Sequence, residues 1–310
     1  MKTVTILSPV YNEAEGIGEF NKQLINILKN ISGYEFKVLY VADKCSDRTW
    51  EELSIISEEH GNVSCLLLSS RYGHQAALTA GMDYANSDVV IMMDSDMQHP
   101  PEVIPLLLQE YEKGFEIVYT IRVDQESISF FKKQTSILFY KIMNFFSETK
   151  VQSGAADFRL ISRDVCQVFK ESIKEHNPFY RGLFQWIGFK QTSITFKANE
   201  RFRGASKYNF KRLVHFAVSG IISFSKKPLR TSIYLGFLIA LIGFLFALIM
   251  IIYGLSTMSF PPGWLTIVVL LCLFSGTQLI SVGVLGEYIA LVFDEVRNRP
   301  RYVVEKKINI

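Results

Sequence analysis

The sequence lacks the motifs that identify several common classes of protein. Its four cysteines, Cys45, Cys65, Cys166 and Cys272, form no CxxC pair and have no histidine at metal-ligand spacing. They fit a reducing compartment, and neither a zinc site nor a disulfide framework is expected. No GxGxxG follows the first predicted strand and no GxxxxGK(S/T) occurs anywhere, which argues against a dinucleotide-dependent oxidoreductase and a phosphate-loop ATPase. No cleavable leader is expected, because the apolar run at 4–9 is too short for a signal peptide.

One long segment carries no charge. The 56 residues from Thr231 to Gly286 contain no Asp, Glu, Lys, Arg or His. A membrane-spanning helix needs about 20 apolar residues, so this segment predicts two spans, at 231–253 and at 264–290, joined by a turn at 254–263. A buried hairpin of a soluble protein is the less favoured alternative.

Basic residues flank the two predicted spans. Lys226, Lys227 and Arg230 precede the first span, and five Lys/Arg residues follow the second between Arg297 and Lys307. Positively charged flanks stay on the cytoplasmic side of a membrane. The sequence therefore predicts a multi-pass protein of the cell (inner) membrane, with both termini and the N-terminal domain in the cytoplasm.

Charge is distributed unevenly over the rest of the chain. Residues 1–196 hold 19 basic and 25 acidic residues, whereas residues 197–230 hold nine basic residues and a single acid, Glu200. Nucleic acid, a membrane surface or an anionic substrate would each attract such a basic segment. The adjoining apolar spans favour the membrane and an anionic substrate, and no nucleic-acid partner is expected. A solvated basic surface is the alternative.

Strand and helix patterns alternate over the first 200 residues. Short apolar runs, mostly rich in β-branched residues, predict strands at 4–8, 36–41, 63–68, 89–93 and 116–119. Helices are predicted at 17–31, 47–59, 75–86 and 101–113. This order is typical of an α/β fold with a mainly parallel sheet and helices on both faces.

Polar residues follow four of the predicted strands. In strand order they are Pro9, Tyr11, Asn12 and Glu13, then Asp43, then Arg71, and finally Asp94, Ser95, Asp96 and Gln98. Parallel sheets of this kind bind ligands beyond the carboxyl ends of their strands. The sequence therefore predicts a binding site at this edge.

The motif Asp94-Ser95-Asp96 indicates the chemistry of that site. Residues two apart in extended chain point the same way, and two close carboxylates repel each other unless a cation compensates them. Oxygen ligands suit Mg²⁺ or Mn²⁺, and Mg²⁺ binds through one or two carboxylates plus phosphate oxygens. A solvated turn is the commoner role of an isolated Asp-x-Asp, but the three companion loops favour a metal-bound nucleotide diphosphate.

Eight stretches spread over the chain carry a family resemblance. They are SPVYNE (8–13), SRYGHQAALTAGMDYA (70–85), MDSDMQHPPE (93–102), DFRLISR (157–163), RGLFQWIGF (181–189), RFRGASKYNFKRL (201–213), SFSKKPLR (223–230) and QLISVGVLGEY (278–288). Together they resemble inverting family 2 glycosyltransferases of the GT-A (Rossmann-like) fold that act on polyisoprenyl phosphates, such as bactoprenol glucosyltransferases and, more distantly, dolichol-phosphate mannose synthases. The chain departs from many relatives at 42–45, where it has Ala-Asp-Lys-Cys instead of Asp-Asp-Gly-Ser, and at Ala156, where many have Gly.

The resemblance implies roles for individual residues. The nucleotide sugar would be bound by Pro9, Tyr11, Asn12, Glu13, Asp43, Arg71, Asp94, Ser95 and Arg122. The acceptor phosphate would be bound by Arg159, Arg203, Ser206, Lys207 and Tyr208. Asp96 and Gln98 would hold Mg²⁺ or Mn²⁺. The catalytic residues would be Asp94, Asp96 and Asp157, the last either as a general base or as a residue that orients Arg159 or Arg163.

The resemblance implies transfer of a single sugar from a nucleotide diphosphate sugar, with UDP-hexose favoured, to polyprenyl (undecaprenyl) phosphate at the cytoplasmic membrane face. A processive polysaccharide synthase is disfavoured by the two spans and by the missing Gln-x-x-Arg-Trp motif. A catalytically silent scaffold or an accessory subunit of a lipid-sugar flippase stays open, as does a homo-oligomer. The sequence does not identify the sugar.

The expected organisation has four parts. A GT-A catalytic domain at 1–200 is followed by a basic interfacial segment at 201–230, two transmembrane helices within 231–290 and a cytoplasmic tail at 291–310. Interfacial helices are expected at 128–146, where packing against the sheet is the alternative, and at 210–225.

Overall fold

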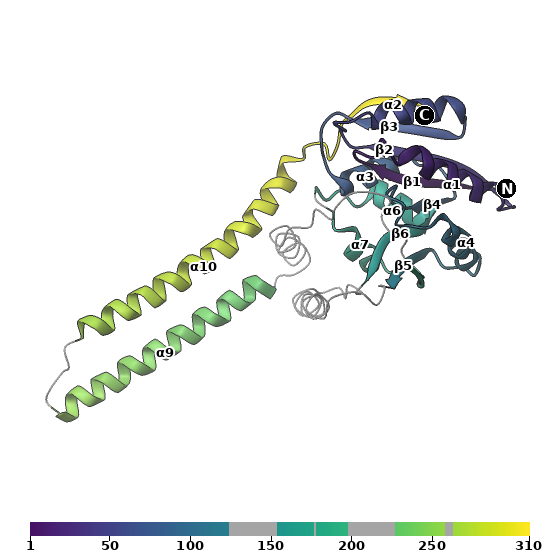
Figure 1. Cartoon of the computed structure of the whole chain (residues 1–310). Coiled ribbons are helices and arrows are strands. Elements are labelled where there is room, and N and C mark those ends of the chain that lie inside the picture. The colour runs from purple at the N-terminus through teal and green to yellow at the C-terminus, as the bar shows by residue number, and fades with distance from the viewer. Residues whose placement is uncertain (124–153, 177, 198–226, 258–262) are drawn as a thin grey trace. The chain divides into compact units, whose positions relative to one another are not determined.

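The computed structural model describes residues 1–123, 154–176, 178–197, 227–257 and 263–310. The described residues form two compact units. Unit 1 combines the described residues up to 197 with residues 298–310, and unit 2 contains those from 227 to 297 (Figure 1). The expected interfacial helices and the predicted acceptor residues at 203–208 lie outside the described residues.

Unit 1 is built on an eight-stranded sheet of order β7-β5-β6-β4-β1-β2-β3-β8. The strands are β1 (Lys2–Val10), β2 (Tyr34–Ala42), β3 (Val63–Leu68), β4 (Val89–Met92), β5 (Ile117–Val123), β6 (Ala155–Ser162), β7 (Gln191–Lys197) and β8 (Val304–Ile308). The pairs β1–β2, β1–β4, β2–β3 and β5–β7 are parallel. β6 runs antiparallel to β4 and β5, and β8 runs antiparallel to β3. The predicted α/β class with a mainly parallel sheet is confirmed.

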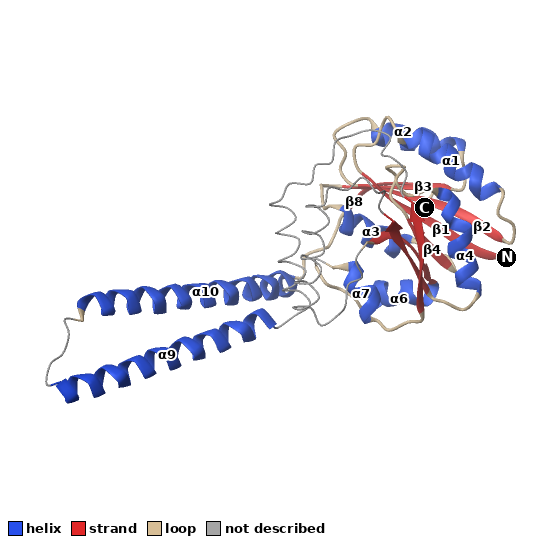
Figure 2. Cartoon of the chain, turned by 60° about the horizontal axis from the view of Figure 1, so that its bottom comes forward, coloured by secondary structure: helices blue, strands red, loops and turns tan. Residues whose placement is uncertain are grey.

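Helices cover both faces of this sheet (Figure 2). α1 (Ile17–Lys29), α2 (Thr49–Glu59), the 3-10 helix η1 (Pro101–Val103) and α4 (Ile104–Glu112) share one hydrophobic core with the strands. α3 (His74–Tyr84) and α6 (Arg163–Glu171) pack on the opposite face. α7 (Tyr180–Trp186) joins α6 there, with 4.5 Å between the ring centroids of Phe169 and Phe184.

The alternation of side chains along β1 explains this layering. Ile6 points into the core beneath α1, whereas its neighbour Leu7 faces α3 on the other side of the sheet, as expected for a strand with a period of two. The approach of α3 is close: a Cβ atom added at Gly81 would lie 2.0 Å from Leu7 Cδ1. Glycine at this position therefore lets α3 pack directly onto the strand that leads into the site.

The C-terminal segment of the chain adds an edge strand to unit 1. β8 pairs with β3 in the register Cys65↔Ile308 and Leu66↔Lys307. Just before it, the Tyr302 hydroxyl donates to Asp83 Oδ2 at 2.9 Å. The sequence predicted a cytoplasmic tail at 291–310. In the structure α10 runs to Arg297, residues 298–310 belong to unit 1, and 304–308 of these form the edge strand β8. The short, charged segment VEKKI gave little strand signal.

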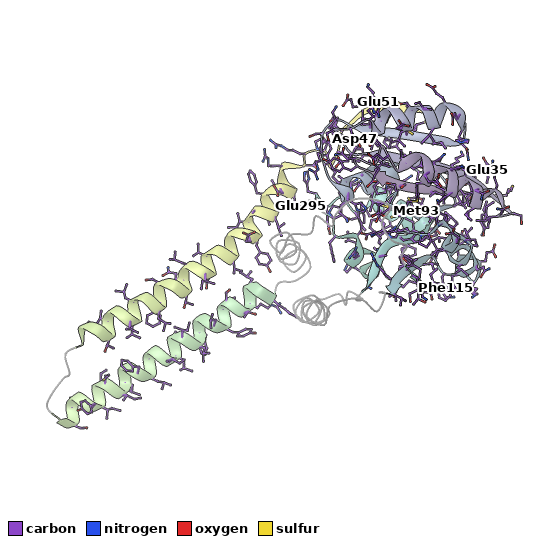
Figure 3. All side chains as sticks on the ribbon, viewed as in Figure 1. Glu35, Asp47, Glu51, Met93, Phe115 and Glu295 are labelled. Carbon is purple, nitrogen blue, oxygen red and sulfur yellow. The ribbon has the colours of Figure 1, made fainter. Side chains whose placement is uncertain are left out.

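Unit 2 consists of two long apolar helices, α9 (Lys227–Thr257) and α10 (Trp264–Arg297). Each contains a stretch long and apolar enough to cross a membrane, at 229–253 with mean hydropathy 3.0 and at 269–297 with mean hydropathy 1.9. Large apolar side chains project from both helices (Figure 3), and Phe237 and Leu279 are 70% and 72% exposed. The predicted pair of spans is thus present as helices, and α9 continues four residues beyond the predicted end at 253.

Candidate active site

Loops from four parallel strands line one cleft at the carboxyl edge of the sheet. The cleft has a volume of about 280 Å³. It is lined by Pro9, Val10, Tyr11, Glu13, Asp43, Arg71, Gly73, His74, Ala77, Asp94, Ser95 and Asp96. The structure thus brings together most of the residues that the sequence assigned to the donor site.

The loop after β1 is fastened to the loop after β2. Asn12 adopts a positive φ of 54°. Its side-chain oxygen accepts the backbone N–H of Ser46 at 2.9 Å, and its amide nitrogen donates to Ser46 Oγ at 3.0 Å. Asn12 is absent from the lining of the cleft. It was predicted to bind the donor, and in this structure it instead joins two loops of the site.

Asp43 organises the loop between β3 and α3. Its carboxylate accepts the backbone N–H groups of Tyr72 at 2.8 Å and Gly73 at 2.9 Å. Gly73 has a φ of +94°, a conformation that favours glycine. In the same loop, the Arg71 guanidinium stacks 4.3 Å from the centre of the Tyr11 ring. The carboxylate predicted to contact the nucleoside therefore also shapes the wall of the cleft.

Asp94 follows the buried Met93 at the end of β4 (Figure 3). Its Oδ1 lies 2.9 Å from His74 Nε2. Its backbone N–H donates to His99 Nδ1 at 2.9 Å, so this nitrogen of His99 is not a donor to the carboxylate. Burial alone would raise the pKa of Asp94, but the hydrogen-bonded His74 and the charge of Arg181 help to hold it well below the usual range.

The turn after Asp94 presents oxygen ligands. Asp96 Oδ1 accepts the backbone N–H of Gln98 at 3.1 Å, and Met97 between them has a φ of 66°. Gln98 Oε1 in turn accepts from Arg122 Nη1 at 3.3 Å, which places Arg122 beside the turn. Carboxylate and amide oxygens fit a hard cation such as Mg²⁺ or Mn²⁺. Among the described residues no group of three His, Cys, Asp or Glu forms a complete metal cage, so phosphate oxygens and water would complete the coordination.

Asp157 on β6 is held by two arginines. Arg181 of α7 donates to both carboxylate oxygens, at 3.1 and 3.0 Å, and Arg159 Nη2 lies 3.4 Å from Oδ1. Burial alone would raise the pKa of Asp157, but the charges of both arginines and the hydrogen bonds from Arg181 lower it. Arg163 pairs with Asp88 instead. A carboxylate with a lowered pKa is a poor general base.

Arg159 is enclosed in unit 1. It is 3% exposed, donates to Ala156 O at 2.9 Å, and its guanidinium stacks 4.5 Å from the centre of the Phe184 ring. Burial lowers its pKa to about 10, against the opposing effect of Asp157. The sequence assigned it to the acceptor phosphate, but its described contacts are with Asp157 and the protein interior. Arg181 was not among the predicted residues. It is the single charged residue of the stretch RGLFQWIGF, and nothing in that stretch indicated a pairing with Asp157.

The chain is similar in sequence to known glycosyltransferases. Residues 5–169 match the model of Glycosyl transferase family 2. An uncharacterized glycosyltransferase of Bacillus subtilis is 38% identical over 306 residues, covering 99% of this chain and 94% of the relative. A bactoprenol glucosyl transferase of Shigella phage SfII is 35% identical over 303 residues, covering 98% and 97%.

A solved structure shares the fold. Mannosyl-3-phosphoglycerate synthase from Rubrobacter xylanophilus superposes with a TM-score of 0.50 at 14% sequence identity, over 74% of each chain. At this identity the likeness shows the GT-A-like fold alone.

Proposed function

Because the chain belongs to glycosyl transferase family 2, we propose that this glycosyltransferase moves one sugar, with inversion, from a nucleotide diphosphate sugar to undecaprenyl phosphate. UDP-hexose is the proposed donor, and the cytoplasmic face of the cell membrane is the proposed location. The observation that carries the proposal is similarity to a bactoprenol glucosyl transferase over 98% of the chain, which includes both apolar helices as well as the cleft.

The donor binds in the cleft at the ends of β1 to β4. Tyr11, Asp43 and Arg71 surround the nucleoside, and Asp94 and Ser95 lie beside the diphosphate. Ser95 is buried and its hydroxyl donates to Pro9 O at 3.2 Å, which joins the loops after β1 and β4. The support for this assignment is the convergence of four strand ends on one polar cleft.

Asp96 and Gln98 hold a divalent cation, Mg²⁺ or Mn²⁺, on the diphosphate. When bound, this ion supplies positive charge to the diphosphate as it leaves. The hydrogen bond from the Gln98 backbone N–H to Asp96 Oδ1 fixes the turn that carries both proposed ligands. Arg122, whose guanidinium contacts Gln98, adds a further positive charge on the same side.

The acceptor requires little general-base catalysis. A phosphate monoester has a second pKa of about 6 and is largely a dianion at neutral pH, so its oxygen is already a nucleophile. Asp157 therefore serves as a positioning residue that fixes Arg181 and Arg159. Catalysis comes mainly from alignment of the two substrates and from charge stabilisation. Arg203, Ser206, Lys207 and Tyr208 bind the acceptor phosphate in this proposal.

The sheet of unit 1 constrains the proposed membrane arrangement. β3 precedes both apolar helices in the sequence and β8 follows them, yet the two strands are hydrogen-bonded neighbours. Both ends of the hairpin must therefore lie on one side of a membrane, so α9 and α10 cross it as a pair. With the flanking Lys and Arg residues this side is the cytoplasm. The proposed domains are the catalytic unit up to residue 200, the interfacial segment 201–230 and the membrane hairpin within 231–290.

An assay of lipid-linked sugar formation tests the proposal. Membranes that contain the full-length protein are incubated with Mg²⁺, undecaprenyl phosphate and one radiolabelled nucleotide sugar at a time from a panel. We expect one sugar to enter the organic phase on undecaprenyl phosphate, and membranes without the protein to show none. Label that appears in a polymer would instead support a processive synthase. Absence of any transfer across the panel would contradict the proposal.

A further inference from the structure

His74 occupies a constrained position at the wall of the cleft. It is the first residue of α3. It directly follows Tyr72 and Gly73, whose backbone N–H groups donate hydrogen bonds to the Asp43 carboxylate. Its side chain lines the cleft and is 39% exposed. Asp43, directly after the neighbouring strand β2, fixes the loop that precedes His74 and so helps to orient the start of α3 toward the cleft. His74 belongs to the stretch 70–85 that carries the family resemblance, which assigns it no role; from the sequence, a structural hydrogen bond and a substrate contact are both open to it.

The groups that face His74 are mainly acidic. Asp94, from the loop after β4, accepts the hydrogen bond of Nε2 at 2.9 Å. Asp157 of β6 also acts on the ring by its charge, and Arg181 of α7 opposes it. Burial alone would lower the pKa of His74, but Asp94 and Asp157 outweigh burial and raise it to about 9. The ring is thus an imidazolium at neutral pH.

The charged residues that line the cleft are mostly acidic, and the His74 imidazolium supplies positive charge there. Four of the described lining residues are carboxylic acids: Glu13, Asp43, Asp94 and Asp96. Of the described lining residues, Arg71 and His74 are the ones able to carry positive charge, and Arg71 is stacked on Tyr11. A nucleotide diphosphate adds further negative charge to this acidic cleft, and its binding depends strongly on each nearby cation.

We propose that His74 is a binding residue for the diphosphate of the donor, whose positively charged ring holds Asp94 through Nε2 and compensates the phosphate charge in the cleft. This inference rests on the proposed function, since it takes the cleft to be the donor site. It assigns no proton transfer to His74. It also gives the two motif carboxylates different roles: Asp94 pairs with His74, and Asp96 is the proposed metal ligand.

Nucleotide binding to the purified full-length protein tests this role. Calorimetry in detergent compares UDP with uridine, which lacks the phosphates, for the wild type and for His74→Gln, His74→Asn and His74→Lys. His60→Gln, outside the cleft, is the control. A charge-assisted hydrogen bond is worth enough to change affinity about tenfold or more. We expect the two neutral variants to bind UDP about tenfold more weakly, uridine binding to stay unchanged, and His74→Lys and His60→Gln to resemble the wild type.

Several results would overturn the inference. Equal losses of UDP and uridine affinity would indicate that His74 shapes the pocket and does not act through charge. The inference would also be overturned if the neutral variants bound UDP as tightly as the wild type, or if His74→Lys bound UDP as weakly as His74→Gln. Failure of the proposed function has a different signature: a wild-type protein that binds neither UDP nor GDP has no donor site. If GDP is bound more tightly, the same comparison is made with GDP and guanosine.

Discussion

Asp94 and Asp96 are only two residues apart, yet their surroundings differ. Asp94 is hydrogen-bonded to His74, whereas Asp96 accepts the backbone N–H of Gln98 within its own turn. The sequence pattern treats the two carboxylates as equivalent, because alternation along a strand makes them point the same way. The structure places them in different surroundings, and our proposal therefore assigns the metal to Asp96.

Replacing Asp96 tests that assignment. Asp96→Asn keeps the shape of the side chain but removes the charge that would bind the ion. We expect sugar transfer to fall at least about a hundredfold, with normal expression and membrane insertion. The control is Glu35→Gln, an exposed residue near the start of β2, at the opposite edge of the sheet. Near-normal transfer by Asp96→Asn in Mg²⁺ would contradict the metal assignment.

Replacing Asp157 tests whether it acts as a general base or positions Arg159 and Arg181. In Asp157→Asn the buried Arg159 and its neighbour Arg181 lose their shared carboxylate, which costs about 3 kcal/mol of stability when a buried pair is broken. We expect a lower Tm and a lower kcat, while the acidic limb of the pH–rate profile persists because the acceptor phosphate itself titrates near a pH of about 6. Loss of that limb would identify Asp157 as the base. Asp88→Asn, at the ion pair with Arg163, is the control.

The stability effect of Asp157 also depends on pH. Its pKa is lowered in the folded protein, so its contribution is present at neutral pH, above the pKa of the unfolded chain, and is lost as the pH falls through the folded value. The difference in Tm between the wild type and Asp157→Asn should therefore shrink in acid. A difference that grows in acid would contradict the pairing with Arg181 and Arg159.

At the scale of elements, the first five strands and their helices follow from hydrophobic pattern. The predicted strands at 4–8, 36–41, 63–68, 89–93 and 116–119 correspond to β1 to β5 with shifts of a few residues. The central residues of β1 to β4 are apolar on both faces of the sheet, as expected for parallel strands covered by helices on both sides. The strand ends that line the cleft were predictable for the same reason.

β6, β7 and β8 were not predicted, and for β6 and β8 the reasons are physical. β6 carries Asp157 and Arg159 inside the fold, so its charge pattern does not mark a buried strand. β8 is an edge strand with charges on exposed positions. The pairing of Asp157 with Arg181 joins a strand to a helix 24 residues later, and no local pattern records such a contact.

The packing of α3 on β1 makes a prediction about stability. Gly81→Ala puts a Cβ atom 2.0 Å from Leu7 Cδ1 and 2.7 Å from Cδ2, and Leu7 is fully buried. Overpacking of this kind costs about 1–3 kcal/mol, so Tm should fall. Gly18→Ala in α1 meets no atom within 4 Å and should leave Tm unchanged or slightly higher. Equal effects of the two substitutions would show that α3 does not pack as closely as described.

At the scale of the whole molecule, the pairing of β8 with β3 constrains the membrane topology. Because one sheet contains residues from before and after the apolar hairpin, the two flanks cannot lie on opposite sides of a bilayer. A single crossing is thereby excluded for a folded unit 1. This constraint is independent of the Lys/Arg distribution, and both lead to the same arrangement.

Cysteine labelling measures that arrangement. A cysteine at Ser256, near the end of α9, should react with a membrane-impermeant maleimide from outside the cell. One at Glu35 should react only when the cytoplasmic side is accessible. The parent protein gives the background from the native cysteines. Labelling of the Ser256→Cys variant from the cytoplasmic side alone would contradict the proposed topology.

The position of β8 in the chain also bears on biogenesis. A ribosome makes β8 only after both apolar helices, so β3 has an open edge until the hairpin has been synthesised. An open edge strand is a template for aggregation, and domains begin to fold during synthesis. The sheet can close only after translation has passed the hairpin. A nascent chain that stalls there keeps the unpaired edge of β3, which chaperones or proteases can recognise.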